Sequence, residues 1–147
     1  MTNPEIELLL VEDSRNDAEL TIRALKKNKI ANNILHLRDG AAALHFLFGT
    51  GEFADRNVHQ KPRVVLLDLK MPKVDGLEVL RQIKQNELTK TIPVVVLTSS
   101  KEDPDIDMAY ALGANSYIVK PVDFEGFTKA VGELGLYWMI LNQGPQK

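Results

Sequence analysis

Acidic, hydroxyl and basic side chains follow several short apolar runs of the sequence, at the points where those runs end. Glu12 and Asp13 follow the first run, and Asp68 follows the third. Thr98 comes after the fourth run and Lys120 after the fifth. Three carboxylates brought together would repel one another, and a single lysine could not balance them. A hard divalent cation such as Mg²⁺, which prefers oxygen ligands, would offset that charge.

A carboxylate supported by such a cation suggests phosphoryl chemistry. Asp68 could stay ionised and act as a nucleophile toward phosphorus, as carboxylates do when they form aspartyl phosphates. Lys120 and the Thr98 hydroxyl could hold the other oxygens of the transferred group. Each residue alone also has an ordinary explanation, since an acid after a strand is usually a turn residue or a helix cap. The chemical hypothesis depends on these residues sharing one edge of one sheet.

The apolar runs alternate along the chain with segments of helical periodicity. Continuous apolar runs are typical of strands that are covered on both faces. Successive βα units predict an α/β fold, a doubly wound parallel sheet with helices on both faces. Ligand sites in such sheets form beyond the carboxyl ends of the strands, where the polar residues fall. The expected strands are 8–11, 34–37, 64–67, 94–97 and 117–119, and the expected helices span about 16–28, 41–48, 75–87, 103–112 and 123–141.

The composition is that of an ordinary single domain. The 147 residues are 44% hydrophobic and 26% charged, and the net charge is -2. This balance gives no reason to expect nucleic acid or an anionic membrane as a partner. The absence of cysteine excludes disulfides and thiolate metal sites. Residues 1–6 lack the basic region of a secretory signal, and no apolar run approaches the roughly 20 residues of a membrane span, so we expect a cytoplasmic location.

The order of the polar motifs along the chain is also informative. It resembles the receiver domain of two-component response regulators (the CheY-like family) over about residues 5–134. The resemblance implies a flavodoxin-like fold with five parallel strands in the order 2-1-3-4-5. That order would place the polar strand ends on adjacent strands. The motifs that carry the resemblance are Glu12-Asp13, Asp68 with Met71-Pro72 and Asp75-Gly76, Thr98, and Lys120-Pro121.

The resemblance implies roles for the residues of the acidic cluster. Asp68 would be the phosphoacceptor, phosphorylated by a phosphohistidine of a sensor histidine kinase. Glu12, Asp13 and Asp68 would surround Mg²⁺, and Asp13 and Asp68 would be its direct carboxylate ligands. The backbone carbonyl of Lys70 would be the remaining protein ligand, and Lys120 would pair with the phosphoryl group.

The resemblance also implies a switch that responds to phosphorylation. Thr98 would move toward the phosphoryl group while Tyr117 turns inward, which would remodel the face made by the fourth helix, the fifth strand and the fifth helix. The protein would act in two-component phosphorelay signalling. It would not be an enzyme with external substrates, because Asp68, Thr98 and Lys120 would catalyse only its own phosphorylation and dephosphorylation.

Two segments depart from the usual pattern of the family. The connection 49–62 is longer than most helix-to-strand connections, and it is either a partner contact or a tolerated insertion. Residues 136–141 are all apolar and lie beyond the receiver domain expected at 1–134. We expect residues 135–147 to extend the last helix as the surface of a homodimer, with folding back on the domain as the alternative. No output domain is expected, and these features resemble the small regulators paired with phytochrome-type histidine kinases.

Two other functions stay open on the sequence. An Mg²⁺-dependent phosphohydrolase of the haloacid-dehalogenase type also uses an aspartate after a strand, but it has a second aspartate as general acid where this chain has Lys70. A phosphorylation-independent binding module on the same fold would not need the complete acidic cluster. His36, His45 and His59 lack metal-ligand spacing and are predicted to be ordinary surface or partly buried residues.

Overall fold

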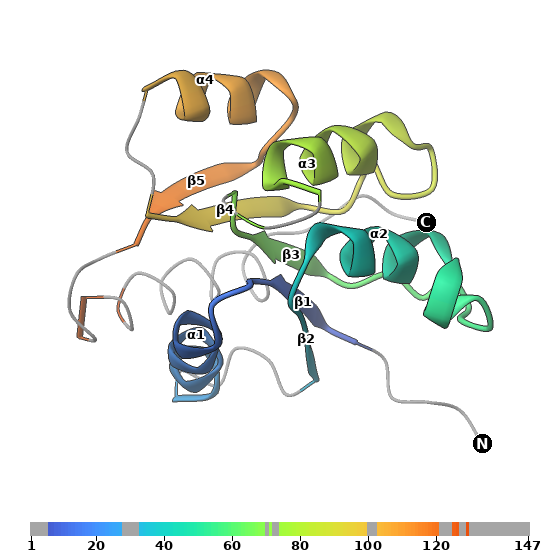
Figure 1. Cartoon of the computed structure of the whole chain (residues 1–147), viewed down its shortest axis with the longest axis horizontal. Coiled ribbons are helices and arrows are strands. Elements are labelled where there is room, and N and C mark those ends of the chain that lie inside the picture. The colour runs from blue at the N-terminus through green and yellow to red at the C-terminus, as the bar shows by residue number, and fades with distance from the viewer. Residues whose placement is uncertain are drawn as a thin grey trace.

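Five strands form one parallel sheet in the part of the chain that the computed structural model describes, residues 6–27, 33–69, 71, 74–99, 103–120, 125–126 and 129. The strand order β2-β1-β3-β4-β5 and the parallel pairing of all neighbours confirm the predicted topology (Figure 1). The strands are β1 (Leu8–Val11), β2 (Ile34–Leu37), β3 (Val64–Leu67), β4 (Val94–Thr98) and β5 (Ser116–Val119).

Helices cover both faces of the sheet. Helix α1 (Arg15–Lys27) packs on one face, and α2 (Gly40–Phe48), α3 (Gly76–Gln85) and α4 (Asp103–Ala111) pack on the other (Figure 1). These bounds agree with the predicted ones to within two residues at each end, which is the usual uncertainty of a helix terminus.

The predicted last helix at 123–141 is described only at residues 125, 126 and 129, which are helical. The predicted domain boundary after residue 134 and the apolar segment 136–141 lie outside the described residues.

Alternate residues of each central strand contribute to two hydrophobic clusters. In β1, Leu9 and Val11 belong to the cluster that contains the buried side chains of α2 and α3. Leu8 and Leu10 belong to the cluster beneath α1. Every residue of β1, β3 and β4 is buried, which explains why these strands are continuous apolar runs and not alternating ones.

The start of α3 is fitted closely against the end of β3. Asp75 caps the helix, because its Oδ1 accepts a hydrogen bond of 3.0 Å from the Glu78 N–H. Gly76 follows, and a Cβ at this position would lie 2.3 Å from the carbonyl oxygen of Asp68 and 2.6 Å from the Cα of Leu69. A glycine is therefore required here for α3 to begin beside the strand end that carries Asp68.

The long connection after α2 is folded against that helix. It contains a short 3-10 helix, η1 (Gly51–Phe53), whose Phe53 ring meets the Phe46 ring edge-on with centroids 5.3 Å apart. The Arg56 guanidinium lies 3.9 Å from the centroid of Phe46 and donates hydrogen bonds to the carbonyl oxygens of Phe46 and Gln60. Arg56 thus joins the later part of the connection to α2.

Replacing Arg56 by lysine should lower the free energy of unfolding by about 1–2 kcal/mol, because an ammonium group cannot stack on the ring and donate to two carbonyls together. Chemical denaturation would measure the loss. Arg63→Lys, at an exposed arginine just beyond the connection, is the control and should change stability by less than about 0.5 kcal/mol. Equal losses in the two variants would show that Arg56 does not hold the segment.

Candidate functional site

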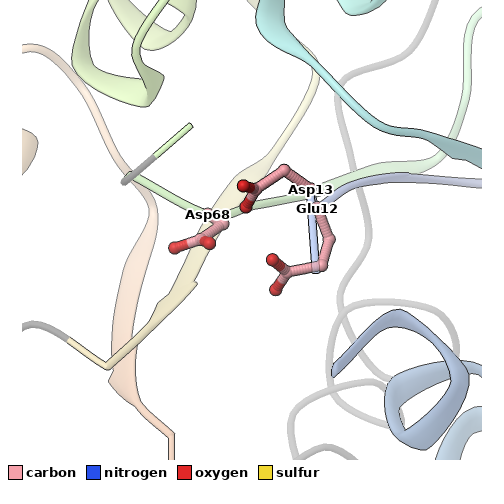
Figure 2. A group of neighbouring side chains, drawn as sticks. All are labelled: Glu12, Asp13 and Asp68. Atoms are coloured by element: carbon pink, nitrogen blue, oxygen red, sulfur yellow. The ribbon is translucent and has the colours of Figure 1, made fainter. Parts of the chain in front are cut away.

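Three carboxylates meet at the carboxyl edge of the sheet. Glu12 and Asp13 follow β1 and Asp68 follows β3, and oxygens of the three side chains lie within 4.8 Å of one another (Figure 2). Glu12 is 2% exposed and Asp68 is 7% exposed, while Asp13 is half-buried. This compact, oxygen-only donor set fits a hard divalent cation. Lys70, the predicted carbonyl ligand, lies outside the described residues.

Backbone hydrogen bonds of the sheet extend one residue beyond β1 and β3 and hold Glu12 and Asp68 in place. The backbone N–H of Glu12 donates to the carbonyl of Leu37 in β2, and the N–H of Asp68 donates to the carbonyl of Val11 in β1, each at 3.0 Å. Glu12 Oε2 also accepts a hydrogen bond of 3.1 Å from the backbone N–H of Ser14. The acids are therefore held in place by hydrogen bonds to the backbones of neighbouring strands and of the turn into α1.

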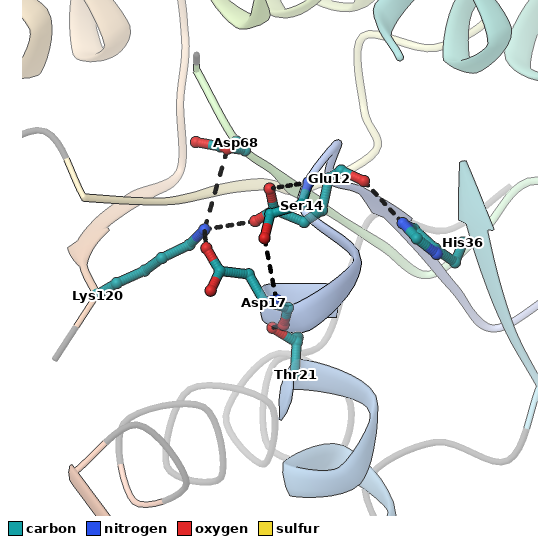
Figure 3. A network of polar contacts seen from close by, with 7 residues as sticks. All are labelled: Glu12, Ser14, Asp17, Thr21, His36, Asp68 and Lys120. Carbon is teal, nitrogen blue, oxygen red and sulfur yellow. Dashed lines mark hydrogen bonds and ion pairs between the residues drawn. The ribbon is translucent and has the colours of Figure 1, made fainter. Parts of the chain in front are cut away.

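Lys120 enters the cluster from the end of β5 (Figure 3). Its ammonium nitrogen is hydrogen-bonded to Glu12 Oε1, lies 2.8 Å from Asp17 Oδ2 and lies 3.9 Å from Asp68 Oδ2. The Lys120 side chain is only 9% exposed. Its backbone N–H donates to the carbonyl of Thr98 at 2.8 Å, so the ends of β4 and β5 are joined beside the acids.

Burial and charge shift the pKa values of two groups in the cluster. Burial raises the pKa of Glu12 to about 7; the hydrogen bond from Lys120 opposes this rise, and the proximity of Asp68 adds to it. Burial alone would lower the pKa of Lys120, but its contacts with Asp17, Glu12 and Asp68 outweigh burial and raise it. Lys120 is therefore protonated at neutral pH, and it faces more carboxylates than it can neutralise.

The structure brings most of the predicted site residues together. Glu12, Asp13, Asp68 and Lys120 form one cluster, as the strand order requires. Thr98 is the last residue of β4, between β3 and β5, and it is fully buried. Tyr117 lies farther back in β5, opposite Val96, and is half-buried against the core.

Two polar contacts of this site were not predicted. Asp17 reaches Lys120 from the first turn of α1, a position where an acid is common simply because it complements the helix dipole. The Nε2 of His36 lies 2.7 Å from the carbonyl oxygen of Glu12, to which it donates a hydrogen bond (Figure 3). Both contacts join residues far apart in the sequence, so no local pattern indicates them.

Glu12 should make the metal-free protein less stable as the pH rises from about 4.5, its ordinary pKa, to about 7, its pKa in the fold. The folded state binds the proton more tightly than the unfolded chain does, so stability present below pH 4.5 is lost as the acid ionises. Glu12→Gln resembles the protonated acid. Denaturation curves should therefore give this variant and the unaltered protein similar stabilities near pH 4.5, and the variant should become the more stable one by pH 8.

Glu19→Gln, which removes an exposed carboxylate of α1, serves as the control for the loss of one charge. If the stability difference between Glu12→Gln and the unaltered protein did not change with pH, the pKa of Glu12 would not be raised in the folded state.

No helix of the described residues is long and apolar enough to cross a membrane.

Two curated relatives match almost the whole chain. FilR2 of Methanothrix harundinacea, named as a probable methanogenesis regulatory protein, is 45% identical over 138 residues, which cover 94% of this chain and 86% of FilR2. The response regulator Rcp1 of Synechocystis sp. is 41% identical over 138 residues, which cover 94% of this chain and 92% of Rcp1.

Solved structures of response regulators share the fold. The Mn²⁺-bound form of Rcp1 has a TM-score of 0.87 and 40% identity, with 97% of this chain and 100% of that chain covered. The phosphorylated cyanobacterial phytochrome response regulator RcpA has a TM-score of 0.88 and 34% identity, with the same coverage. The family model of the response regulator receiver domain matches residues 8–132. The chain therefore belongs to the response regulator receiver domain family, whose members act in two-component signal transduction.

Proposed function

We propose that this receiver accepts a phosphoryl group on Asp68 from a phosphohistidine of a sensor histidine kinase. The observation that carries the proposal is the placement of Asp68, a buried carboxylate that shares a compact acidic cluster with Glu12 and Asp13 and has the Lys120 ammonium 3.9 Å away. Mg²⁺ is the proposed cation, held by Asp13 and Asp68 beside Glu12, with the backbone carbonyl of Lys70 completing the protein ligands.

The chain's own residues orient and stabilise the transfer. A carboxylate oxygen of Asp68 forms a bond to phosphorus while the bond from phosphorus to the imidazole nitrogen of the kinase histidine breaks, and the electron pair of that bond leaves with the imidazole. Lys120 donates a hydrogen bond to an oxygen of the transferred group and remains protonated throughout. Bound Mg²⁺ supplies charge neutralisation for the carboxylates and the phosphoryl oxygens.

The response to phosphorylation is proposed to begin at Thr98 and Tyr117. Thr98 closes β4 beside the acids and would hydrogen-bond a phosphoryl oxygen, and the half-buried Tyr117 in the adjacent β5 would turn inward with it. The affected face includes α4, where Met108 is 49% exposed and Tyr110 is 50% exposed. Apolar side chains at this exposure suit a surface that binds a partner when its shape changes.

The relatives support narrower proposals about context. RcpA is a phytochrome response regulator, and we infer that the kinase of this receiver is also of the phytochrome type and that both act in the cytoplasm. We also infer that the receiver domain ends near residue 134, that residues 135–147 form the dimer surface and that no nucleic acid is bound. An aspartyl phosphohydrolase is the weaker candidate, because Lys70 stands where such enzymes place an aspartate as general acid, and an ammonium gives up its proton far less readily than a carboxylic acid does.

Incubation with acetyl phosphate and Mg²⁺ should add the mass of one phosphoryl group, and Asp68→Asn should abolish the addition because an amide cannot attack phosphorus. Intact-protein mass spectrometry would measure both. Asp75→Asn is the control, since Asp75 is an exposed helix cap and its loss should leave phosphorylation intact. A stable phosphoryl adduct on the Asp68→Asn variant would refute the assignment, and rapid turnover of small phosphate esters would favour the phosphohydrolase.

The full chain should sediment as a dimer, and a chain truncated after Leu134 should sediment as a monomer, because the truncation removes the apolar residues 136–141. Analytical ultracentrifugation at the same molar concentrations, with and without acetyl phosphate and Mg²⁺, would test this. A monomeric mass for both chains under all conditions would show that the C-terminal residues do not make the dimer.

A further inference from the structure

His36 is a polar residue of the strand β2 whose side chain reaches the turn after β1. Leu35 and Leu37 pack against the cluster that contains α2 and α3, so strand alternation places His36 on the opposite face, which α1 covers. The Nε2 atom of His36 lies 2.7 Å from the carbonyl oxygen of Glu12 (Figure 3). Because a carbonyl oxygen can only accept a hydrogen bond, Nε2 of the imidazole ring must carry a hydrogen.

This hydrogen bond and one from the sheet hold the backbone of Glu12 on both sides. The pairing of β1 with β2 ends at Val11 and Leu37. The N–H of Glu12 still donates to the carbonyl of Leu37 at 3.0 Å, which holds the peptide unit before Glu12. The His36 ring holds the next peptide unit, since the carbonyl of Glu12 belongs to the unit that joins Glu12 to Asp13. Because each peptide unit is planar, holding both units restricts the two backbone torsions of Glu12.

The place of Asp13 depends on those torsions. The Cα of Asp13 is part of the peptide unit that His36 holds, so a rotation of this unit would move the Asp13 side chain. That side chain has an oxygen within 4.8 Å of oxygens of Glu12 and Asp68. The backbone of Asp68 is held separately, by the hydrogen bond from its own N–H to the carbonyl of Val11. The contact of His36 therefore acts on the part of the acidic cluster that follows β1.

We propose that His36 is a positioning residue of the metal site: its imidazole N–H fixes the peptide unit between Glu12 and Asp13 and so aims the Asp13 carboxylate at the divalent cation. The inference rests on the proposed role of Asp13 as a direct ligand of Mg²⁺. This ion demands nearly ideal octahedral geometry and short bonds to oxygen, so a small displacement of one carboxylate weakens its binding. Groups that orient a metal ligand without touching the metal contribute to affinity in this way.

Mg²⁺ should bind about three- to tenfold more weakly to His36→Met than to the unaltered protein, because methionine has no N–H to donate to the carbonyl. Isothermal titration calorimetry at one fixed pH would measure the affinity. The amide nitrogen of His36→Gln can donate from about the position of Nε2, so this variant should bind Mg²⁺ within about twofold of the unaltered protein. His59→Met makes the matched change at an exposed residue of the connection after α2 and should leave the affinity unchanged.

Two further measurements separate positioning from a general structural role. Denaturation in the presence of a chelator reports the stability of the metal-free variants, and a purely structural role would lower it without changing the Mg²⁺ affinity of the folded protein. Phosphorylation by acetyl phosphate should need about three- to tenfold more Mg²⁺ to reach half its maximal rate in His36→Met, and the rate should approach that of the unaltered protein when Mg²⁺ saturates. His36→Val, which also lacks the donor and favours a strand, gives the same comparison if His36→Met does not fold.

Equal Mg²⁺ affinities of His36→Met and the unaltered protein would show that the positioning role is wrong. An affinity of His36→Gln as low as that of His36→Met would also contradict it, because the donor would be restored without effect. In both cases the proposed function would stand. If the unaltered protein bound no Mg²⁺, the proposed function itself would be overturned, and the role of His36 with it.

Discussion

Carboxylates from distant parts of the sequence converge at the carboxyl edge of the sheet, where the Lys120 ammonium faces them. Glu12, Asp13 and Asp68 place their oxygens within 4.8 Å of one another, and Asp17 approaches the same lysine from α1. Burial removes the solvation that a charged carboxylate needs and raises the pKa of Glu12 to about 7, and the neighbouring Asp68 adds to this rise. The site is therefore electrostatically strained without a cation, and a divalent cation would relieve that strain directly.

The rest of the fold supplies the rigidity that such a cluster needs. Clustered acids would separate if they were on flexible loops, but here β1 and β3 are buried throughout and pair with each other along their length. The acids begin at the next residue, where the backbone still forms sheet-like hydrogen bonds to Leu37 and Val11. The hydrophobic packing on both faces of the sheet thus stabilises the fold and offsets the destabilising repulsion between the buried charges.

The fold and most of the site could be predicted from the sequence because both depend on patterns that lie along the chain. Buried parallel strands appear in the sequence as continuous apolar runs. A polar residue that follows such a run is expected at the carboxyl edge of the sheet. Asp75 caps a helix, as predicted, and Asp68 lies buried beside two other acids at the edge of the sheet. The contacts of Asp17 with Lys120 and of His36 with Glu12 could not be predicted, because they depend on the three-dimensional placement of α1 and β2 beside β1.

The position of Lys120 distinguishes this site from a simple pairing of opposite charges. The Lys120 ammonium is hydrogen-bonded to Glu12 and Asp17 and forms a longer ion pair, of 3.9 Å, with Asp68. Lys120 thus offsets part of the charge of acids that follow β1 and β3 and of one in the first turn of α1, and a divalent cation would neutralise the charge that remains.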